Sequence, residues 1–412
     1  MTYKKFILFI LVTLVVVTNI LFSETPKEKP YIILISFDGF RWDYTQRDLT
    51  PNLQKMADNG VAALSLKPVF PSKTFPNHYS IITGMYPENH GIIHNDFVDF
   101  FTGRRYKVGD TTSVRESKWY TGEAFWETAE RQSITTASYF WPGSEVNLSY
   151  RRSTYVEYYE HERPYETRVA GVLNWLKLPE EKRPHFITLY FDATDTYGHE
   201  YGPDSPEINW AIQRLDNILG MLLSGLEEMK FLHKTNIIVI SDHGMTSVDG
   251  KRLINIEKIL SGNQFNIQGY GPVMMLDCMD EDKNLIYKKL QKQQANFDVY
   301  LRENLPEFYH FSNHPFISPL ILIANMGWTL VNNEIEAKLI NRTIGGNHGY
   351  DNHHLDMHGI FYAMGPAFKK GYRSGTVWNI DIYPLLCNIF KIFPRQNIDG
   401  KLERIEFILK AK

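Results

Sequence analysis

Apolar runs rich in β-branched and aromatic residues alternate along the chain with segments whose apolar positions recur every three or four residues. Runs of the first kind predict strands buried on both faces, and segments of the second kind predict amphipathic helices. The predicted strands are 31–37, 62–66, 134–140, 186–191, 237–240 and 360–364. The predicted helices are 51–59, 75–83, 123–131, 164–176, 206–229, 283–295 and 377–390. This alternation predicts an α/β fold with a mainly parallel central sheet that helices cover on both faces.

The chain has 412 residues, enough for one large domain or two ordinary ones. We interpret residues 30–395 as one catalytic domain and residues 396–412 as a C-terminal tail. The segment 245–345 is more polar and less periodic than the rest, which predicts a small inserted subdomain.

The N-terminus has the pattern of a targeting segment. Lys4 and Lys5 precede an apolar run of 17 residues from Phe6 to Phe22, and polar residues follow Ser23. This pattern predicts a signal peptide over residues 1–23. The run is also close to the ~20 residues of a membrane span, so an uncleaved N-terminal anchor remains the alternative. We expect a secreted or periplasmic protein whose only membrane contact would be that anchor.

Charge and cysteine content exclude two further classes of protein. The formal net charge is −3 and no basic stripe is visible, so we expect no nucleic-acid polymer as a partner. The two cysteines, Cys278 and Cys387, are too few for a disulfide scaffold, and we interpret both as small buried hydrophobic residues. Whether they pair, and the oligomeric state, are left open by the sequence.

Five short segments rich in Asp, His and Thr follow apolar runs. They are 35–41, 71–78, 195–199, 241–245 and 346–350. Asp38, Asp195 and Asp242 each come just after a predicted strand, with Asp195 in a predicted loop. Because ligands bind at the carboxyl ends of parallel strands, we expect these residues to meet there. Three carboxylates, three imidazoles and one hydroxyl can form two adjacent metal sites that share a nucleophile.

These segments also carry a family resemblance. On the stretches 70–79, 141–145, 241–245 and 346–352, the chain resembles the nucleotide pyrophosphatase/phosphodiesterase family, a branch of the alkaline phosphatase superfamily. The resemblance runs over about residues 31–390. It implies a two-zinc phosphodiesterase with two Zn²⁺ per chain. One zinc is then held by Asp195, His199 and His348, and the other by Asp38, Asp242, His243 and the oxygen of Thr74.

The same resemblance assigns the residues that meet the substrate. Thr74 is the nucleophile and forms a phospho-threonine intermediate that water hydrolyses. A metal ion and a helix N-terminus both favour the threonine alkoxide, although a plain helix cap is the default role for such a residue. Asn95 is assigned to a non-bridging phosphoryl oxygen.

Further family positions concern the nucleotide. Phe75 and Tyr159 match residues that sandwich a nucleobase, and Tyr190 matches one that lines the phosphate pocket. Lys73 is a candidate for holding the nucleotide, with a solvated lysine as the alternative. Stacking on aromatic rings suits every base, so we expect loose base preference.

One stretch departs from the family pattern. The family often has Glu-x-Pro-Asp where this chain has Asp192-Ala193-Thr194-Asp195. The predicted ligand is kept and the proline is lost, from which we expect a looser loop and an altered preference for the leaving group.

The resulting prediction is a phosphodiesterase that releases nucleoside monophosphate from a small nucleotide or phosphodiester substrate. A lysophospholipid or choline phosphodiesterase is the alternative; Phe75 and Tyr159 favour nucleotides, because a choline site would need a cage for the cation. Monoester hydrolysis would require an arginine beside Thr74, and sulfatase chemistry a different nucleophile motif. A non-catalytic binding protein is disfavoured because every expected ligand is present.

Overall fold

The computed structural model describes residues 29–341 and 345–411, and the chain from Tyr31 onward forms one compact unit. The predicted signal peptide or anchor, residues 1–23, lies outside the described residues. Within the described ranges, no helix has both the length and the apolar character needed to cross a bilayer.

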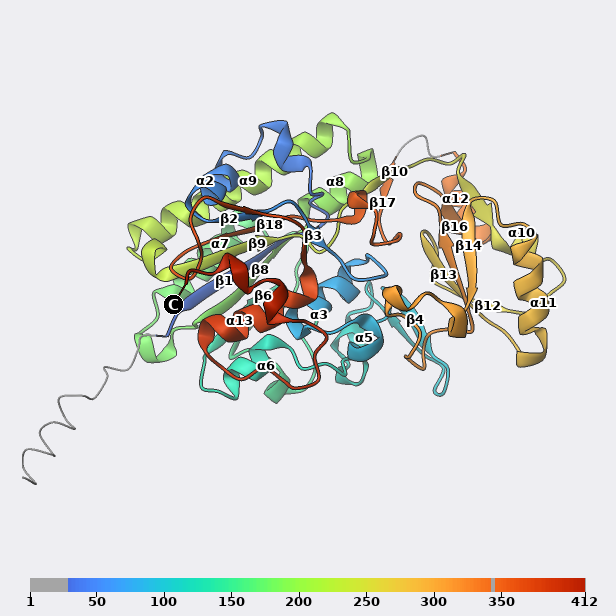
Figure 1. The fold of residues 1–412 in the computed structure, drawn as a ribbon, viewed down its shortest axis with the longest axis horizontal. Coiled ribbons are helices and arrows are strands. Elements are labelled where there is room, and N and C mark those ends of the chain that lie inside the picture. The colour runs from blue at the N-terminus through green and yellow to red at the C-terminus, as the bar shows by residue number, and fades with distance from the viewer. Residues whose placement is uncertain (1–28, 342–344, 412) are drawn as a thin grey trace, which may run out of the picture. The chain divides into compact units, whose positions relative to one another are not determined.

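An eight-stranded sheet forms the centre of this unit (Figure 1). Its strands, in spatial order, are β19 (Tyr372–Ser374), β2 (Val61–Ala63), β18 (Phe361–Met364), β9 (Thr235–Ile240), β1 (Tyr31–Phe37), β8 (Phe186–Phe191), β6 (Thr136–Tyr139) and β7 (Tyr155–Glu157). Strand β18 runs antiparallel to both neighbours, and all other pairs are parallel. The mainly parallel α/β sheet predicted from the sequence is therefore confirmed.

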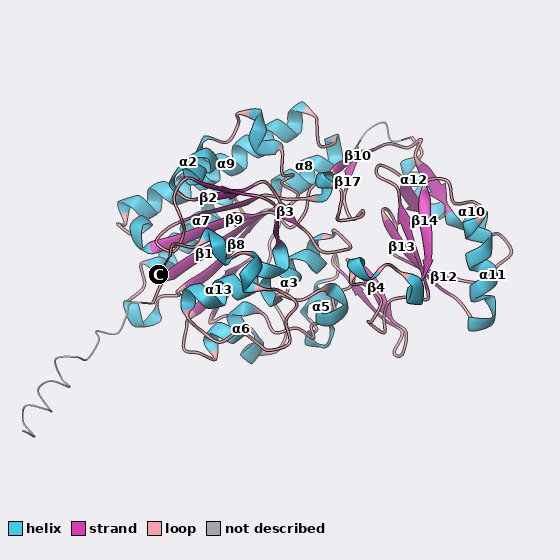
Figure 2. Cartoon of the chain, in the orientation of Figure 1, coloured by secondary structure: helices cyan, strands magenta, loops and turns pink. Residues whose placement is uncertain are grey.

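Helices cover both faces of the sheet, as Figure 2 shows. Strand β1 is wholly buried, with Ile32 and Leu34 in one core and Ile33 and Ile35 in the other. The first core includes residues of α3 (Thr74–Thr83), α6 (Phe125–Glu130) and α13 (Ile382–Phe390). The second includes residues of α2 (Pro51–Asn59), α7 (Tyr165–Leu176) and α9 (Pro206–Glu228). Burial on both faces explains the unbroken apolar sequence of β1.

A second, four-stranded antiparallel sheet lies within segment 245–345. Its order is β12 (Asn266–Gln268), β13 (Val273–Asp277), β15 (Leu320–Ala324) and β14 (Phe297–Leu301). A third core joins this sheet to α10 (Ile256–Ile259) and α11 (Asp280–Gln291), with β11 (Leu253–Asn255), β16 (Thr329–Val331) and α12 (Asn333–Leu339) alongside. Strands β10 (Thr246–Val248) and β17 (Gly345–Asn347) pair antiparallel, which brings the two ends of the segment together.

The remaining helices and strands lie outside these two sheets. They are α4 (Pro87–His90), α5 (Thr111–Arg115), α8 (Ala193–Tyr201), the hairpin of β4 (Asp96–Asp99) and β5 (Arg104–Lys107), and the pair of β3 (Leu66–Lys67) with β20 (Val377–Trp378).

Three local predictions were wrong. Asp195 and His199 lie in helix α8 rather than in a loop, since Asp195 occupies the first turn, where a negative charge is favourable. The predicted helix 377–390 begins only at Ile382, because the β-branched and aromatic pair Val377–Trp378 forms strand β20. The predicted strand 62–66 is split into β2 and β3.

The C-terminal tail packs on the rest of the unit, since Ile405 and Ile408 are buried in the first core. Cys278 and Cys387 are both free thiols; Cys387 is buried as predicted, and Cys278 is only partly buried.

Candidate active site

The three predicted aspartates meet at the carboxyl ends of adjacent strands. Asp38 follows β1, Asp242 follows β9, and Asp195 lies in the first turn of α8 after β8. Asp38 and Asp242 are each only 1% exposed. Gly39 permits this approach: its φ is +67°, and a Cβ there would lie 2.8 Å from the Asp195 Cα. Only glycine fits between the two strand ends.

The three predicted histidines lie beside these carboxylates. His199 is one helical turn after Asp195, and its Nε2 is 3.4 Å from Asp195 Oδ1. His348 Nε2 lies 3.5 Å from the same oxygen. His243 Nε2 lies 3.0 Å from Asp242 Oδ2 and 3.4 Å from Asp38 Oδ1. The rings of His243 and His348 stack with their centroids 3.5 Å apart, so the two predicted half-sites adjoin.

Backbone carbonyls fix the orientation of all three imidazoles. The Nδ1 atoms of His199, His243 and His348 each lie 2.9 Å from a carbonyl oxygen, of Gly346, Gly244 and Ser72 respectively. A carbonyl only accepts, so each Nδ1 donates, and each Nε2 faces the carboxylates. This arrangement is typical of histidines that bind a metal.

Thr74 is the first residue of α3, so its hydroxyl lies at the positive end of that helix. Its Oγ1 is 3.2 Å from His243 Nε2. All seven side chains predicted as ligands or nucleophile therefore form one connected cluster, drawn from segments more than 270 residues apart in the sequence.

The electrostatics of the cluster favour a bound cation. Burial, reinforced by Asp242 and Asp195, raises the pKa of Asp38 well above its ordinary value. Burial alone would also raise the pKa of Asp242, but His243 and His78 outweigh it and hold that pKa below its ordinary value. Three carboxylates this close repel one another, and a divalent cation relieves that repulsion.

The residues present fit two divalent cations. Asp38 Oδ1, Asp195 Oδ1 and Asp242 Oδ2 are buried and have no hydrogen-bond partner among the described residues. The ligand atoms of Asp195, His199 and His348 lie within 4.8 Å of one another, and those of Asp38, Asp195 and His243 do the same. Carboxylate oxygen and imidazole nitrogen are the donor set that suits zinc.

The predicted substrate residues lie around this cluster. Asn95 Oδ1 accepts a hydrogen bond from the backbone N–H of Phe75 at 3.1 Å, which fixes the side chain and leaves its NH₂ group to donate elsewhere. The Tyr190 hydroxyl donates to Asp38 Oδ2 at 2.6 Å. Tyr159, 47% exposed, meets the Tyr190 ring edge-on with the centroids 6.2 Å apart.

His78 belongs to the cluster, and the sequence analysis missed it. Its Nδ1 lies 2.9 Å from the Thr74 carbonyl and 3.3 Å from Asp242 Oδ2, and its Nε2 lies 2.8 Å from Ser36 Oγ. Both nitrogens have hydrogen-bond partners, so His78 supports the first turn of α3; its ring also forms, with Asp38 and Asp242, a third group whose ligand atoms lie within 4.8 Å of one another. Its position one helical turn after Thr74 was the available clue.

Thr194, at the position of the missing family proline, also contacts the cluster. Its buried hydroxyl donates to the backbone carbonyl of Asp38 at 2.6 Å. This hydrogen bond joins the loop after β1 to the first turn of α8. Thr194 stands where the family often has proline, and its hydroxyl links the ends of β1 and β8.

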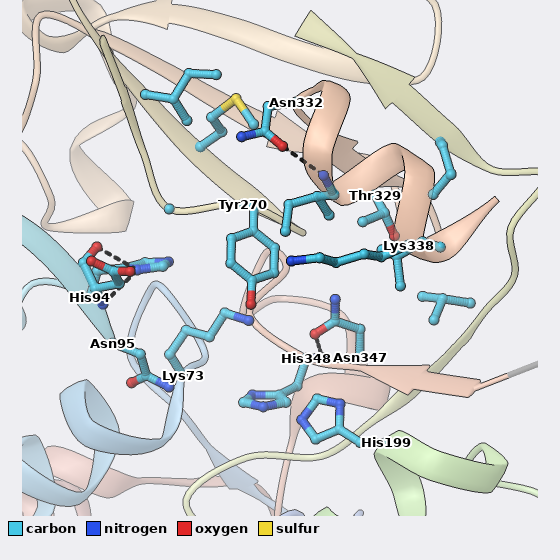
Figure 3. Close-up of a pocket in the computed structure, with 18 of the residues that line it drawn as sticks. Lys73, His94, Asn95, His199, Tyr270, Thr329, Asn332, Lys338, Asn347 and His348 are labelled. Atoms are coloured by element: carbon cyan, nitrogen blue, oxygen red, sulfur yellow. Dashed lines mark hydrogen bonds between the residues drawn. The ribbon is translucent and has the colours of Figure 1, made fainter. Parts of the chain in front are cut away.

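A cavity of about 800 Å³ opens beside the cluster (Figure 3). Lys73, Asn95, His199 and His348 contribute to its lining. Lys73 is 8% exposed and no carboxylate lies within 4 Å of its ammonium among the described residues. Burial, partly offset by Asp195, lowers its pKa to about 8.

The site thus has the features of a hydrolase with a pair of metal ions and a hydroxyl nucleophile. Residues 32–351 match the family described as "Type I phosphodiesterase / nucleotide pyrophosphatase". The chain is 37% identical over 395 residues to human ectonucleotide pyrophosphatase/phosphodiesterase family member 1, covering 93% of this chain and 42% of that protein. It is 37% identical over 393 residues to the venom phosphodiesterase CdcPDE of Crotalus durissus collilineatus, covering 93% of this chain and 47% of that protein. The chain therefore spans under half the length of these relatives.

Solved structures show the same fold. Human ectonucleotide pyrophosphatase / phosphodiesterase 5 superposes with a TM-score of 0.87 at 32% identity, covering 92% of this chain and all of that one. The murine protein, as an inactive threonine-to-alanine variant in complex with AMP, gives a TM-score of 0.87 at 31% identity, covering 93% and 100%. The chain belongs to the type I phosphodiesterase / nucleotide pyrophosphatase family of hydrolases, within the alkaline phosphatase superfamily. The family resemblance stated from the sequence is confirmed.

Proposed function

We propose that this protein is a two-zinc nucleotide pyrophosphatase/phosphodiesterase that releases nucleoside monophosphates through a phospho-threonine intermediate. The observation that carries the proposal is the Thr74 hydroxyl at the start of α3, 3.2 Å from His243 Nε2 and beside three orphaned carboxylate oxygens. Asp195, His199 and His348 would hold one zinc, and Asp38, Asp242, His243 and Thr74 the other. Bound zinc would supply positive charge that stabilises the attacking and leaving oxygens.

The protein's own residues then carry the reaction. Thr74 Oγ1 gives up its proton to solvent and forms a bond to phosphorus while the bond from phosphorus to the leaving oxygen breaks, and that oxygen takes the electron pair. The helix N-terminus favours the alkoxide. A water molecule then gives up a proton and attacks phosphorus from the opposite side, the bond from phosphorus to Thr74 Oγ1 breaks, and Oγ1 takes up a proton as nucleoside monophosphate departs. His78, which contacts the Thr74 carbonyl, holds the first turn of α3 in place.

The substrate contacts follow from the surrounding side chains. Asn95 is held by the Phe75 backbone with its NH₂ group available, so it would donate to a non-bridging phosphoryl oxygen as charge develops there. Phe75 and Tyr159 would stack on the nucleobase, with Tyr159 kept in place by Tyr190. A fold relative that binds AMP supports a nucleotide substrate for this chain.

We also propose export, on the strength of the N-terminal targeting pattern.

The test compares wild-type protein with Thr74→Ala after zinc loading. Release of nucleoside monophosphate from a nucleoside triphosphate, and of nitrophenol from a nitrophenyl nucleotide ester, should fall by at least a thousandfold in the variant. Zinc content should stay near two per chain, which shows that the variant is folded. Unchanged turnover in Thr74→Ala would remove the hydroxyl from the mechanism.

A substrate panel separates this proposal from the lipid alternative. Nucleotides should be cleaved at least a hundredfold more efficiently than a lysophospholipid or glycerophosphocholine. The reverse order would keep the chemistry and replace the nucleotide by a choline phosphodiester.

A further inference from the structure

Tyr159, the exposed half of the proposed base stack, lies in the segment between β7 and α7, outside any helix or strand. Its contacts with the rings of Phe140 and Tyr190 are both edge-on, with interplanar angles of 74° and 70°. Glu145 accepts a hydrogen bond from the Tyr159 backbone N–H, which fixes the main chain and not the ring. The hydroxyl end of the ring therefore needs a polar partner of its own.

His161 supplies that partner. Its Nδ1 lies 3.0 Å from the Tyr159 hydroxyl oxygen and 3.3 Å from Asp192 Oδ2. A carboxylate only accepts hydrogen bonds, so Asp192 favours a proton on Nδ1, and that N–H can also donate to the phenol oxygen. The other nitrogen, Nε2, lies 3.9 Å from a carboxylate oxygen of Glu162, whose side chain is 93% exposed, and such a contact is too weak to turn the ring. The imidazole therefore joins the end of the Tyr159 ring to Asp192.

Asp192 is itself held in place by buried groups. Its other oxygen, Oδ1, lies 3.2 Å from the Tyr165 hydroxyl and 3.3 Å from Arg168 Nη1. Arg168 is fully buried, and it also donates to the backbone carbonyls of Tyr190 and His161, at 3.0 and 3.1 Å. One guanidinium thus ties the end of β8 to the main chain of His161 and, through Asp192, to its side chain.

The same end of β8 leads to the metal cluster. Tyr190 donates to Asp38 Oδ2, and Asp195 follows Asp192 by three residues in the first turn of α8. The base platform and the cation sites are therefore both fixed to one strand end. This common support sets the distance between a stacked base and the reacting phosphate.

We propose that His161 is a positioning residue for the nucleobase. By joining the Tyr159 hydroxyl to the fixed carboxylate of Asp192, it holds the ring in one orientation before the base arrives, so less side-chain freedom is lost when the nucleotide binds. The role concerns binding of the base and leaves the chemistry at Thr74 unchanged. The inference rests on the proposed function, because it requires a nucleotide whose base stacks on Tyr159.

The test measures KM and kcat of the zinc-loaded full-length protein on two esters. One is the nitrophenyl ester of a nucleoside monophosphate, and the other is the nitrophenyl ester of ribose 5-phosphate, which keeps the sugar and phosphate but has no base. His161→Ala should raise KM for the nucleotide ester about fivefold, within the range expected for immobilising one side chain, and should leave kcat within about twofold. KM for the ribose ester should not change. The His161 side chain is 54% exposed, so the variant should fold.

Two further variants show whether His161 acts through its Nδ1 and the Tyr159 hydroxyl. In His161→Asn the amide nitrogen is bonded to Cγ, as Nδ1 is, so KM should return to within about twofold of wild type. Tyr159→Phe keeps the ring and loses the hydroxyl, so it should raise KM as His161→Ala does, and the double variant of Tyr159→Phe and His161→Ala should show no further rise.

His233→Ala is the matched control. His233 is exposed in the turn Leu232–Lys234, which precedes β9 and so lies at the edge of the sheet opposite the site. Its KM for both esters should equal that of wild type.

Three results would overturn the positioning role while the proposed function stands. They are a nucleotide-ester KM within twofold of wild type in His161→Ala, an equal rise in KM on both esters, and additive effects in the double variant. A wild-type protein that hydrolyses neither ester would overturn both the positioning role and the proposed function.

Discussion

Replacing Thr194 by valine should weaken metal binding without changing any predicted ligand. The Thr194 hydroxyl donates to the Asp38 carbonyl at 2.6 Å, and Thr194 is fully buried. Valine has nearly the same shape but no donor, so the carbonyl loses its hydrogen bond in a place that water does not reach. An unsatisfied buried acceptor costs about 1–3 kcal/mol.

The effect should extend to the metal because Asp38 lies on the strand end that Thr194 fixes. Loss of a residue that orients a ligand typically costs about 10–100-fold in metal affinity. Competition with a zinc indicator should therefore show a tenfold or greater loss in Thr194→Val. Thr194→Ser, which keeps the hydroxyl, should bind zinc within threefold of wild type.

Thr83 provides a matched control. Its hydroxyl is also fully buried and also donates to a carbonyl at 2.6 Å, that of Tyr79, at the far end of α3. The Tyr79 carbonyl also accepts the helical hydrogen bond of α3, so Thr83→Val should lose less free energy of unfolding in urea than Thr194→Val, and it should keep wild-type zinc affinity. Equal zinc affinity in Thr194→Val and Thr83→Val would refute the reasoning, because the Thr194 hydrogen bond would then be merely structural.

Three more outcomes follow from the same structure. Chelation of the zinc-loaded protein should abolish turnover and lower the melting temperature. A site whose ligand is present at a thousand times its dissociation constant contributes about 4 kcal/mol to the free energy of unfolding. Calorimetry before and after zinc re-addition measures the effect, and an unchanged melting temperature would contradict a buried metal pair. Tyr190→Phe removes the hydrogen bond to Asp38 Oδ2, so the folded variant should bind zinc about 10–100-fold more weakly than wild type. Unchanged zinc affinity would leave Tyr190 with a role in substrate binding only. Burial lowers the pKa of His90 to about 3, so the unfolded state binds more protons between pH 3 and the ordinary value, and stability falls on acidification through that window. Urea unfolding should show that the free energy of unfolding falls by about 1 kcal/mol more from pH 6.5 to 5.5 in wild type than in His90→Gln. An equal pH dependence of the two free energies would count against a neutral buried imidazole.

The sequence predicted the sheet and the position of its functional edge well, because both depend on local pattern. The continuous apolar stretch of β1 follows from its burial on both faces, and the ends of β1 and β9 mark the edge where Asp38 and Asp242 lie. Helix α2 and strand β8 also begin and end where their patterns predict.

The sequence did not predict what tertiary contacts decide. The segment holding Asp195 and His199 has little helical amphipathicity, and it becomes a helix because Asp195 and Thr194 anchor its first turn against the end of β1. The supporting role of His78 depends on Ser36 and Asp242, from two other segments. Likewise, the cavity beside Lys73 is lined both by residues near Lys73 and Asn95 and by residues of segment 245–345, which are far apart in the sequence.

One hydrogen bond has a consequence for biosynthesis. His348 Nδ1 donates to the carbonyl of Ser72, 276 residues earlier in the chain. A ribosome has therefore made the segment of helix α3 long before the last imidazole of the cluster exists, and at ~5–20 residues per second that interval lasts tens of seconds. During that time the nascent chain has no complete pair of cation sites. Metal binding is thus expected to follow synthesis. It would be a late folding step that brings the segments around Ser72 and His348 into contact.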